Sequence, residues 1–172
     1  MNKVCFLDRD GVLNEDTGYV FDWSKTELLI QNITVIAPLE ARGYKFCIIT
    51  NQSGIGRRYF SLSQYNSFMH ELRIRLCDLN LIIDTEYFCP HVRSDNCVCR
   101  KPQNGMFERA FSENQYLRHN SIMIGDRESD LQAAGKSKVQ HRFLLSESGV
   151  KYKDLNDNVT YFDNLTSAFD SI

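Results

Sequence analysis

A chain of 172 residues is long enough to bury one full hydrophobic core, so we expect a single domain over residues 1–172. Twenty basic and 22 acidic residues give a formal net charge of −2, which leaves no basic excess for nucleic acid or an anionic membrane. No apolar run approaches the roughly 20 residues of a membrane span, and the run near Met1 is too short for a signal peptide. We therefore expect a cytoplasmic protein, by default a monomer, without a membrane or nucleic-acid partner.

Short apolar runs alternate with amphipathic stretches, which is typical of an α/β protein with a mainly parallel sheet. In chain order the expected elements are a strand at 4–7, a helix at 33–42, a strand at 46–49, a helix that begins after Ser61, a weaker strand at 81–88, a helix at 106–117, a strand at 122–124, a helix at 129–134, a weaker strand at 143–145 and an edge strand at 159–162. The region after Gly135 carries no motif and is expected to complete the sheet.

Two of the helices have clear boundary signals. Gln64 completes a capping box with Ser61. The apolar stripe that follows at helical spacing is predicted to pack in the core, and comprises Leu62, Tyr65, Phe68, Met69, Leu72, Leu76 and Leu79. The helix at 33–42 should end at Gly43, and Pro38 predicts a kink or a late start.

Polar residues follow each of the three strongest strands. The motif DRDG follows the first strand at 8–11, TNQSG follows the second at 50–54, and Gly125-Asp126 follows the third, with Asp130 four residues on. Because the carboxyl ends of parallel strands share one edge of a sheet, we expect these clusters to meet in one site.

The carboxylates of Asp8, Asp10 and Asp126 would form an oxygen-rich site suited to Mg²⁺. Asp8 and Asp10 lie two residues apart and can project from the same side of a strand end, so that one serves as nucleophile and the other as acid/base. Gly11 permits the tight turn that must follow.

Two further segments supply groups that suit a phosphoryl oxygen. The turn at 50–54 offers a hydroxyl and backbone N–H groups, and Arg100 and Lys101 add positive charge. Each motif alone has a simpler interpretation, as solvated acids, an ordinary turn or a helix cap. The functional prediction depends on their occurrence together and in this order.

The six cysteines fall into two groups. Cys5, Cys47 and Cys77 lie in apolar runs and are predicted to be buried free thiols. The second group clusters with a histidine directly before Arg100, and consists of Cys89, His91, Cys97 and Cys99. Without a secretory signal, such a cluster favours a metal over disulfides. A redox role for Cys97 and Cys99 is an alternative, although their spacing is not C-x-x-C.

The motifs FLDRDG, IITNQSG, RKP and MIGDRESD together resemble the four-motif pattern of the haloacid dehalogenase superfamily of phosphatases, over nearly the whole chain from Val4 to about Ala134. The resemblance implies a Rossmann-like three-layer α/β/α fold and phosphoryl transfer through an aspartyl-phosphate. It assigns Asp8 as the nucleophile and Asp10 as the acid/base. Thr50 and Lys101 would hold the phosphoryl group, and Mg²⁺ would bind Asp8, the backbone carbonyl of Asp10, and Asp126.

The segment CPHVRSDNCVCRKP resembles the zinc loop of one branch of this superfamily, which comprises the D,D-heptose 1,7-bisphosphate phosphatases and the histidinol-phosphate phosphatases. The resemblance implies a closed, structural Cys₃His zinc site over residues 89–99 that fixes Arg100 and Lys101 beside the phosphate. Only 39 residues separate Asp10 from Thr50, and 50 separate Thr50 from Lys101, so we expect no large cap domain and an open site.

Features that favour the heptose enzymes are the segment DTGYV at 16–20, Ser53, and Gly105-Met106, although Asn104 stands where proline is usual. The short zinc loop and Arg127 favour the histidinol enzymes. The heptose assignment predicts hydrolysis of the C7 phosphate of D-glycero-D-manno-heptose 1,7-bisphosphate, in nucleotide-heptose and lipopolysaccharide biosynthesis. The residues expected to bind this sugar are Asp16, Thr17, Gly18, Tyr19, Asn51, Gln52, Ser53 and Arg100.

Two other classes of function remain as alternatives. A polynucleotide 3′-phosphatase shares the superfamily motifs but would need a basic groove, which the charge balance does not favour. A non-catalytic zinc-binding module would have no reason to keep the acidic motifs and Lys101 in register.

Overall fold

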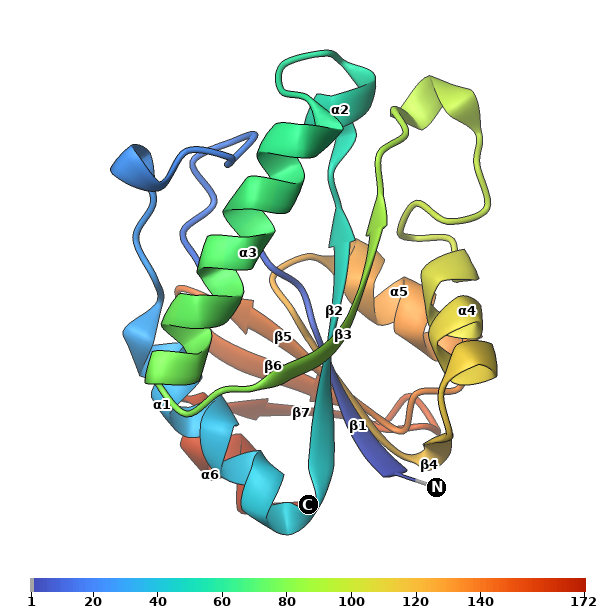
Figure 1. Ribbon diagram of the computed structural model, residues 1–172. Coiled ribbons are helices and arrows are strands. Elements are labelled where there is room, and N and C mark those ends of the chain that lie inside the picture. The colour runs from blue at the N-terminus through green and yellow to red at the C-terminus, as the bar shows by residue number, and fades with distance from the viewer. Residues whose placement is uncertain (1) are drawn as a thin grey trace.

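The computed structural model describes residues 2–172, and its centre is a seven-stranded sheet in the order β3-β2-β1-β4-β5-β6-β7 (Figure 1). Strands β1 to β5 are parallel, whereas β6 and β7 pair antiparallel to their neighbours. The strands are β1 (Asn2–Leu7), β2 (Tyr44–Asn51), β3 (Ile83–Cys89), β4 (Tyr116–Gly125), β5 (His141–Ser146), β6 (Gly149–Lys153) and β7 (Val159–Phe162). The expected mainly parallel α/β fold is confirmed.

Helices cover both faces of the sheet, which makes three layers. Those that pack in the larger core are α1 (Ile30–Ile36), α3 (Leu62–Asp78) and α6 (Leu165–Phe169). Those in the smaller core on the opposite face are α4 (Gly105–Glu113) and α5 (Glu128–Lys136). The short remaining elements are η1 (Trp23–Lys25), η2 (Ala37–Arg42), α2 (Ser53–Gly56) and η3 (Arg93–Asp95).

The alternation of side chains in β1 explains why two cores form. Cys5 and Leu7 point into the larger core, whereas Val4 and Phe6 point into the smaller one, because successive residues of a strand face opposite sides. All four are fully buried. A central parallel strand is covered on both faces and therefore reads as one continuous apolar run.

The first predicted helix is replaced by two elements. An α-helix ends at Ile36, and the chain continues as the 3-10 helix η2 with Pro38 near its start. Gly43 closes it in the left-handed conformation at φ 85°, as expected from the sequence.

The helix expected at 106–117 ends at Glu113 instead. Asn114 is extended, and from Tyr116 the chain is already in β4, paired with Asn2 of β1. Strand β6 was not predicted at all. Among the core predictions, Leu62 and Cys77 are wrong, because both are exposed on α3.

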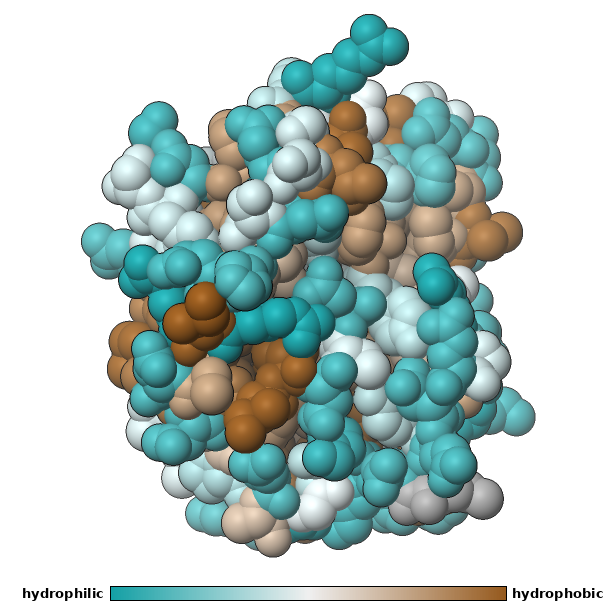
Figure 2. Space-filling view, in the orientation of Figure 1, coloured by the Kyte–Doolittle hydropathy of each residue, from teal (hydrophilic) through white to brown (hydrophobic). Residues whose placement is uncertain are grey.

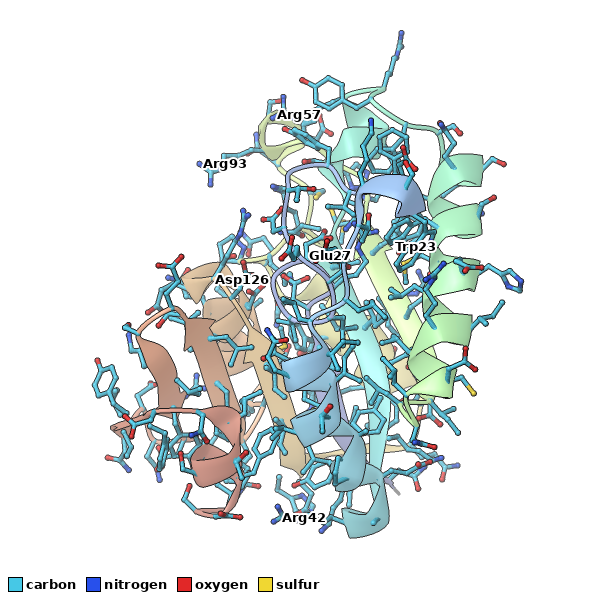
Figure 3. All side chains as sticks on the ribbon, turned by 90° about the vertical axis from the view of Figure 1, so that its left-hand side faces the viewer. Trp23, Glu27, Arg42, Arg57, Arg93 and Asp126 are labelled. Atoms are coloured by element: carbon cyan, nitrogen blue, oxygen red, sulfur yellow. The ribbon has the colours of Figure 1, made fainter. Side chains whose placement is uncertain are left out.

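The carboxyl ends of the parallel strands lie together at the end of the molecule that carries α2 and the loop between β3 and α4 (Figure 1). The segment between β1 and α1 crosses the end of the molecule where these strands end, and it packs against α3. There Trp23 stacks on Phe68 with ring centroids 4.4 Å apart and donates a hydrogen bond from Nε1 to the Phe68 carbonyl (Figure 3). Among residues 2–172 the connections form loops and short helices, and no cap domain is present.

The outer surface is mixed in character. Figure 2 shows hydrophobic residues in separate patches among hydrophilic ones on the face that carries α3. Within the described part of the chain, no helix has both the length and the apolar character needed to cross a membrane.

Candidate active site

The three polar clusters predicted to meet do so at the ends of β1, β2 and β4. Their backbones are adjacent because β1 pairs with both β2 and β4, and the Asp8 amide donates to the Ile124 carbonyl at 3.0 Å. A cavity of about 610 Å³ opens here. Its walls include Asp8, Asp10, Asp16, Gly18, Tyr19, Thr50, Asn51, Gln52, Ser53, Arg100 and Lys101. Of the substrate-binding residues expected from the sequence, only Thr17 is absent from this lining.

Lys101 is the buried cation of the site. Its Nζ lies 2.9 Å from Asp8 Oδ2 and 2.7 Å from Asp130 Oδ1, and donates to the Ile49 carbonyl at 2.7 Å. The residue is only 3% exposed. Burial by itself lowers the pKa of Lys101, but Asp130 and Asp8 outweigh that effect and raise the pKa, so that the ammonium form is retained.

Three carboxylates gather near Lys101, and Arg127 Nε lies 3.6 Å from Oδ2 of one of them, Asp126. One oxygen each of Asp8, Asp126 and Asp130 lies within 4.8 Å of the others. Burial raises the pKa of Asp8 to about 7, and the nearby Asp130 and Asp10 add to the rise, while Lys101 opposes it. Burial and Asp130 also raise the pKa of Asp126. Lys101 pairs with Asp8 and Asp130, and Arg127 is shared between Asp126 and Asp16, so the carboxylates around the site outnumber the cations that pair with them.

The geometry around Asp126 suits a hard divalent cation. Its Oδ1 is buried and has no hydrogen-bond partner within residues 2–172. A β-carbon added at Gly11, which has φ +79°, would lie 2.5 Å from Asp126 Oδ2, so the backbone approaches this carboxylate as closely as glycine allows. A buried carboxylate oxygen without a partner is a ligand that Mg²⁺ accepts.

The Asp10 carboxylate accepts hydrogen bonds from a side chain in its own loop and from one in the loop after β2. Gln52 Nε2 donates to Asp10 Oδ2 at 2.9 Å and to Thr50 Oγ1 at 2.8 Å. Asn14 Nδ2 donates to Asp10 Oδ1 at 2.9 Å. Gln52 therefore orients the acid and the hydroxyl relative to each other.

Asn51 links the two loops that carry Thr50 and Lys101. Its Nδ2 donates to the Lys101 carbonyl and its Oδ1 accepts from the Lys101 amide, both at 3.1 Å. Because both amide atoms are used on the backbone of Lys101, Asn51 positions the lysine in this structure.

The mouth of the cavity is rich in arginine, from Arg57, Arg93, Arg100 and Arg127. Arg127 pairs with Asp16, and Arg100 donates from Nη1 to the His91 carbonyl at 3.2 Å. Arg57 and Arg93 lie on the exposed rim, near the top of the molecule in Figure 3, with Asp126 below them. The aromatic side of the mouth is Tyr19, whose ring packs edge-on against Tyr59 at 4.6 Å.

The predicted metal-binding loop brings its four side chains together. Cys99 Sγ lies 3.1 Å from Cys89 Sγ, 3.4 Å from Cys97 Sγ and 3.2 Å from His91 Nδ1. Four ligands around one Zn²⁺ at about 2.3 Å would be separated by about 3.8 Å, close to this spacing. Burial and the neighbouring thiol of Cys99 raise the pKa of Cys89, so a cation beside this sulfur would favour its thiolate.

Two buried charged residues lie within the predicted clusters but were given no role from the sequence. Asp130 is fully buried against Lys101, and its signal in the sequence was the four-residue spacing from Asp126 at the start of α5. Arg9 is also fully buried and binds Asp10. Its only signal was a cation between two acids directly after a buried strand.

Comparisons with known proteins agree with this geometry. Residues 98–167 match a family model described as HAD-hydrolase-like, that is, haloacid dehalogenase-like. The D-glycero-beta-D-manno-heptose-1,7-bisphosphate 7-phosphatase of Helicobacter pylori (strain J99) is 38% identical over 151 residues, which is 87% of each chain. The chain belongs to the haloacid dehalogenase-like hydrolase family.

A second curated relative and one solved structure are also similar to this chain. The D-glycero-alpha-D-manno-heptose-1,7-bisphosphate 7-phosphatase of Photorhabdus laumondii is 33% identical, over 95% of this chain and 92% of its own. The crystal structure of D,D-heptose 1,7-bisphosphate phosphatase from B. bronchiseptica, complexed with magnesium and phosphate, superposes with a TM-score of 0.76 at 30% identity, and covers 83% of this chain and 79% of its own. The predictions of the family and of a phosphatase are thereby confirmed.

Proposed function

We propose that this phosphatase removes the C7 phosphate of D-glycero-D-manno-heptose 1,7-bisphosphate through a phosphorylated Asp8. The observation that carries the proposal is the buried cluster of Asp8, Lys101, Asp126 and Asp130 at the strand ends, in a chain whose relatives are named for this substrate. Phosphoryl transfer needs mainly positioning and charge neutralisation, and this cluster supplies both.

In the first step an Asp8 oxygen attacks phosphorus and the bond from phosphorus to the sugar oxygen breaks. Asp10 gives its proton to that oxygen, so that the sugar leaves as an alcohol. In the second step Asp10 takes a proton from water, the water oxygen attacks phosphorus, and the bond to Asp8 breaks to release inorganic phosphate. Thr50 Oγ1 and Lys101 Nζ bind the phosphoryl oxygens during both steps.

Asp8, Asp126 and the backbone carbonyl of Asp10 would hold Mg²⁺, and Asp130 lies beside them. When bound, the cation neutralises negative charge on the phosphoryl oxygens. Asp130 contributes to the same balance by pairing with Lys101 at 2.7 Å, which keeps the ammonium next to Asp8.

The cluster of Cys89, His91, Cys97 and Cys99 would hold a structural Zn²⁺, because four protein ligands leave no open coordination position. The zinc would fix the backbone that continues into Arg100 and Lys101. Free thiols in a metal cluster suit a reducing compartment, which favours the cytoplasm as the site of this reaction.

The rim of the cavity supports a substrate with a second phosphate. The reaction centre uses the charge of Lys101, and Arg127 is paired with Asp16. Arg57, Arg93 and Arg100 line the same cavity farther out. Arginine suits a phosphate because its planar group donates two parallel hydrogen bonds. A heptose with phosphate at C7 in the reaction centre would present its C1 phosphate toward this rim.

The test is phosphate release from the alpha and beta anomers of heptose 1,7-bisphosphate and from histidinol phosphate, measured at equal enzyme and Mg²⁺. We expect kcat/KM for one heptose anomer to exceed that for histidinol phosphate by about a hundredfold, because histidinol phosphate has no group for the arginine rim. Asp8→Asn is the control and should release no phosphate from any of the three. A preference for histidinol phosphate would overturn the substrate assignment and leave the Asp8 chemistry in place.

A further inference from the structure

Arg9 is the largest side chain that is fully buried in the protein, with 0% exposure. A buried guanidinium is costly unless it is paired and hydrogen-bonded, so a fold that retains one must satisfy it. Arg9 stands between Asp8 and Asp10 and therefore directly adjoins the reaction centre.

The guanidinium group of Arg9 makes most of its contacts with Asp10. Nε donates to Asp10 Oδ1 at 3.0 Å, and Nη2 lies 2.8 Å from Oδ1 and 2.9 Å from Oδ2. The other side chains that donate hydrogen bonds to the Asp10 carboxylate are the neutral amides of Asn14 and Gln52. Arg9 is thus the only charged partner of the Asp10 carboxylate in the described residues.

The guanidinium group is also anchored in the protein core. Nη2 also donates to the Val20 carbonyl at 2.7 Å. The ring of Phe68 lies 4.8 Å from Cζ, that of Tyr65 lies 6.0 Å away, and Nη1 lies 4.0 Å from Met69 Sδ. Three residues of α3 therefore fix the guanidinium plane, and that plane in turn fixes the carboxyl group of Asp10.

We propose that Arg9 is a positioning residue that orients the Asp10 carboxyl group toward the leaving oxygen of the substrate. The inference depends on the proposed role of Asp10 as the acid/base. A lysine cannot replace Arg9 in this role, because an ammonium is a point charge and lacks the planar fork that contacts both carboxylate oxygens.

This role predicts a dependence on the leaving group. Asp10 delivers its proton while the bond from phosphorus to the ester oxygen breaks, and the leaving group departs as an alcohol. A nitrophenolate leaves as a stable anion without that proton, whereas an alkoxide does not. Misplacing Asp10 should therefore slow the hydrolysis of alkyl phosphates far more than that of 4-nitrophenyl phosphate.

The experiment compares Arg9→Lys with the wild type on 4-nitrophenyl, phenyl and benzyl phosphate. The quantity measured is kcat/KM, which reports the step that expels the leaving group. We expect kcat/KM to fall by less than about fivefold for the nitrophenyl ester and by about a hundredfold for the benzyl ester. In an Asp10→Asn background, Arg9→Lys should add no further loss, because it acts through Asp10.

The matched control is Arg73→Lys. Arg73 also binds a carboxylate through Nε and Nη2, that of Glu86, but it lies away from the cavity on α3. It should leave the ratio between the benzyl and nitrophenyl esters unchanged. Melting temperatures of all variants separate a change in this ratio from a loss of folded protein.

An equal loss for all three esters in Arg9→Lys, with a leaving-group dependence preserved in Asp10→Asn, would overturn the proposal for Arg9. If Asp10→Asn itself showed no leaving-group dependence, the acid role would fail and the inference would fail with it. Neither result depends on which sugar is the substrate.

A second variant covers the case in which Arg9→Lys does not fold. Phe68→Leu removes the ring that packs on the guanidinium and does not contact Asp10. It should lower kcat/KM for benzyl phosphate by about tenfold more than for the nitrophenyl ester. An unchanged ratio between the two esters would overturn the proposal.

Discussion

At the scale of single residues, the site is built from charges that are unfavourable without a ligand. Asp8 and Asp130 share one lysine beside Asp126, and burial raises the pKa of Asp8 to about 7 from an ordinary value of 3.8. The folded protein therefore binds a proton at Asp8 more tightly than the unfolded chain does. Ionised Asp8 destabilises the metal-free fold at high pH, and this cost declines as the pH falls through about 7 and is gone only near the ordinary value of 3.8.

We predict that Asp8→Asn stabilises the metal-free protein at pH 8. The free energy of unfolding, measured by urea titration in EDTA, should rise by up to about 4 kcal/mol, since each unit of pKa corresponds to about 1.4 kcal/mol. The wild type should gain stability between pH 8 and pH 6, whereas the variant should lack this component. Mg²⁺ should stabilise the wild type strongly and the variant weakly.

The control for this prediction is Asp78→Asn, at the exposed end of α3, which should keep the pH dependence of the wild type. If Asp8→Asn kept the same pH dependence in EDTA, Asp8 would not be the group responsible.

The sequence predicted those site residues that follow an apolar strand directly, such as Asp8 and Thr50. It did not predict the partners that satisfy them. The burial of Asp130 depends on the way α5 packs against the loop of Lys101, and that of Arg9 on α3. Such partners come from distant elements, and neither propensity nor periodicity contains that information.

At the scale of elements, the loop between β3 and α4 contains both the Cys/His cluster and the buried lysine of the cavity. Its cysteines and histidine come together within a few ångströms, and the next residues are Arg100 and Lys101. Lys101 is also tied to Asn51 at the end of β2. The position of Lys101 therefore depends on both the loop and the neighbouring strand.

We predict that Cys97→Ser removes bound zinc and lowers kcat/KM for 4-nitrophenyl phosphate by about tenfold or more, because a displacement of Lys101 by an ångström is costly. Zinc content per chain, measured by plasma mass spectrometry, should fall from one to near zero. Cys77→Ser is the matched control, since Cys77 is a free, exposed cysteine on α3, and it should change neither quantity. Full activity in a zinc-free Cys97→Ser protein would contradict the structural role.

The element boundaries show where local signals fail. The apolar periodicity of α4 continues in the sequence to Leu117, but Asn114 ends the helix and Tyr116 pairs with Asn2 in the sheet. Strand β6 was not predicted because Val150 is its only buried residue, so its sequence has no apolar run. The capping box at Ser61, by contrast, is a local interaction, and the structure reproduces it.

At the scale of the whole molecule, the chain after β5 carries no predicted catalytic residue, yet it closes one end of the sheet. β6 and β7 extend the sheet, and α6 covers the larger core. Arg42 of η2 donates to the carbonyls of Phe169 and Ile172 and so ties the end of the chain to the first half. This region should contribute to stability without changing the chemistry.

We predict that Phe169→Ala lowers the free energy of unfolding by about 3–5 kcal/mol, the usual range for removing a buried phenylalanine. Its ring is 5% exposed and packs edge-on against Phe143 of β5 at 5.3 Å. Tyr161→Ala is the control, since Tyr161 on β7 is 73% exposed and its loss should change stability by less than about 0.5 kcal/mol. Below the melting temperature both variants should keep the kcat of the wild type. A lower kcat in fully folded Phe169→Ala would instead mean that the C-terminal helix supports the geometry of the active site through β5.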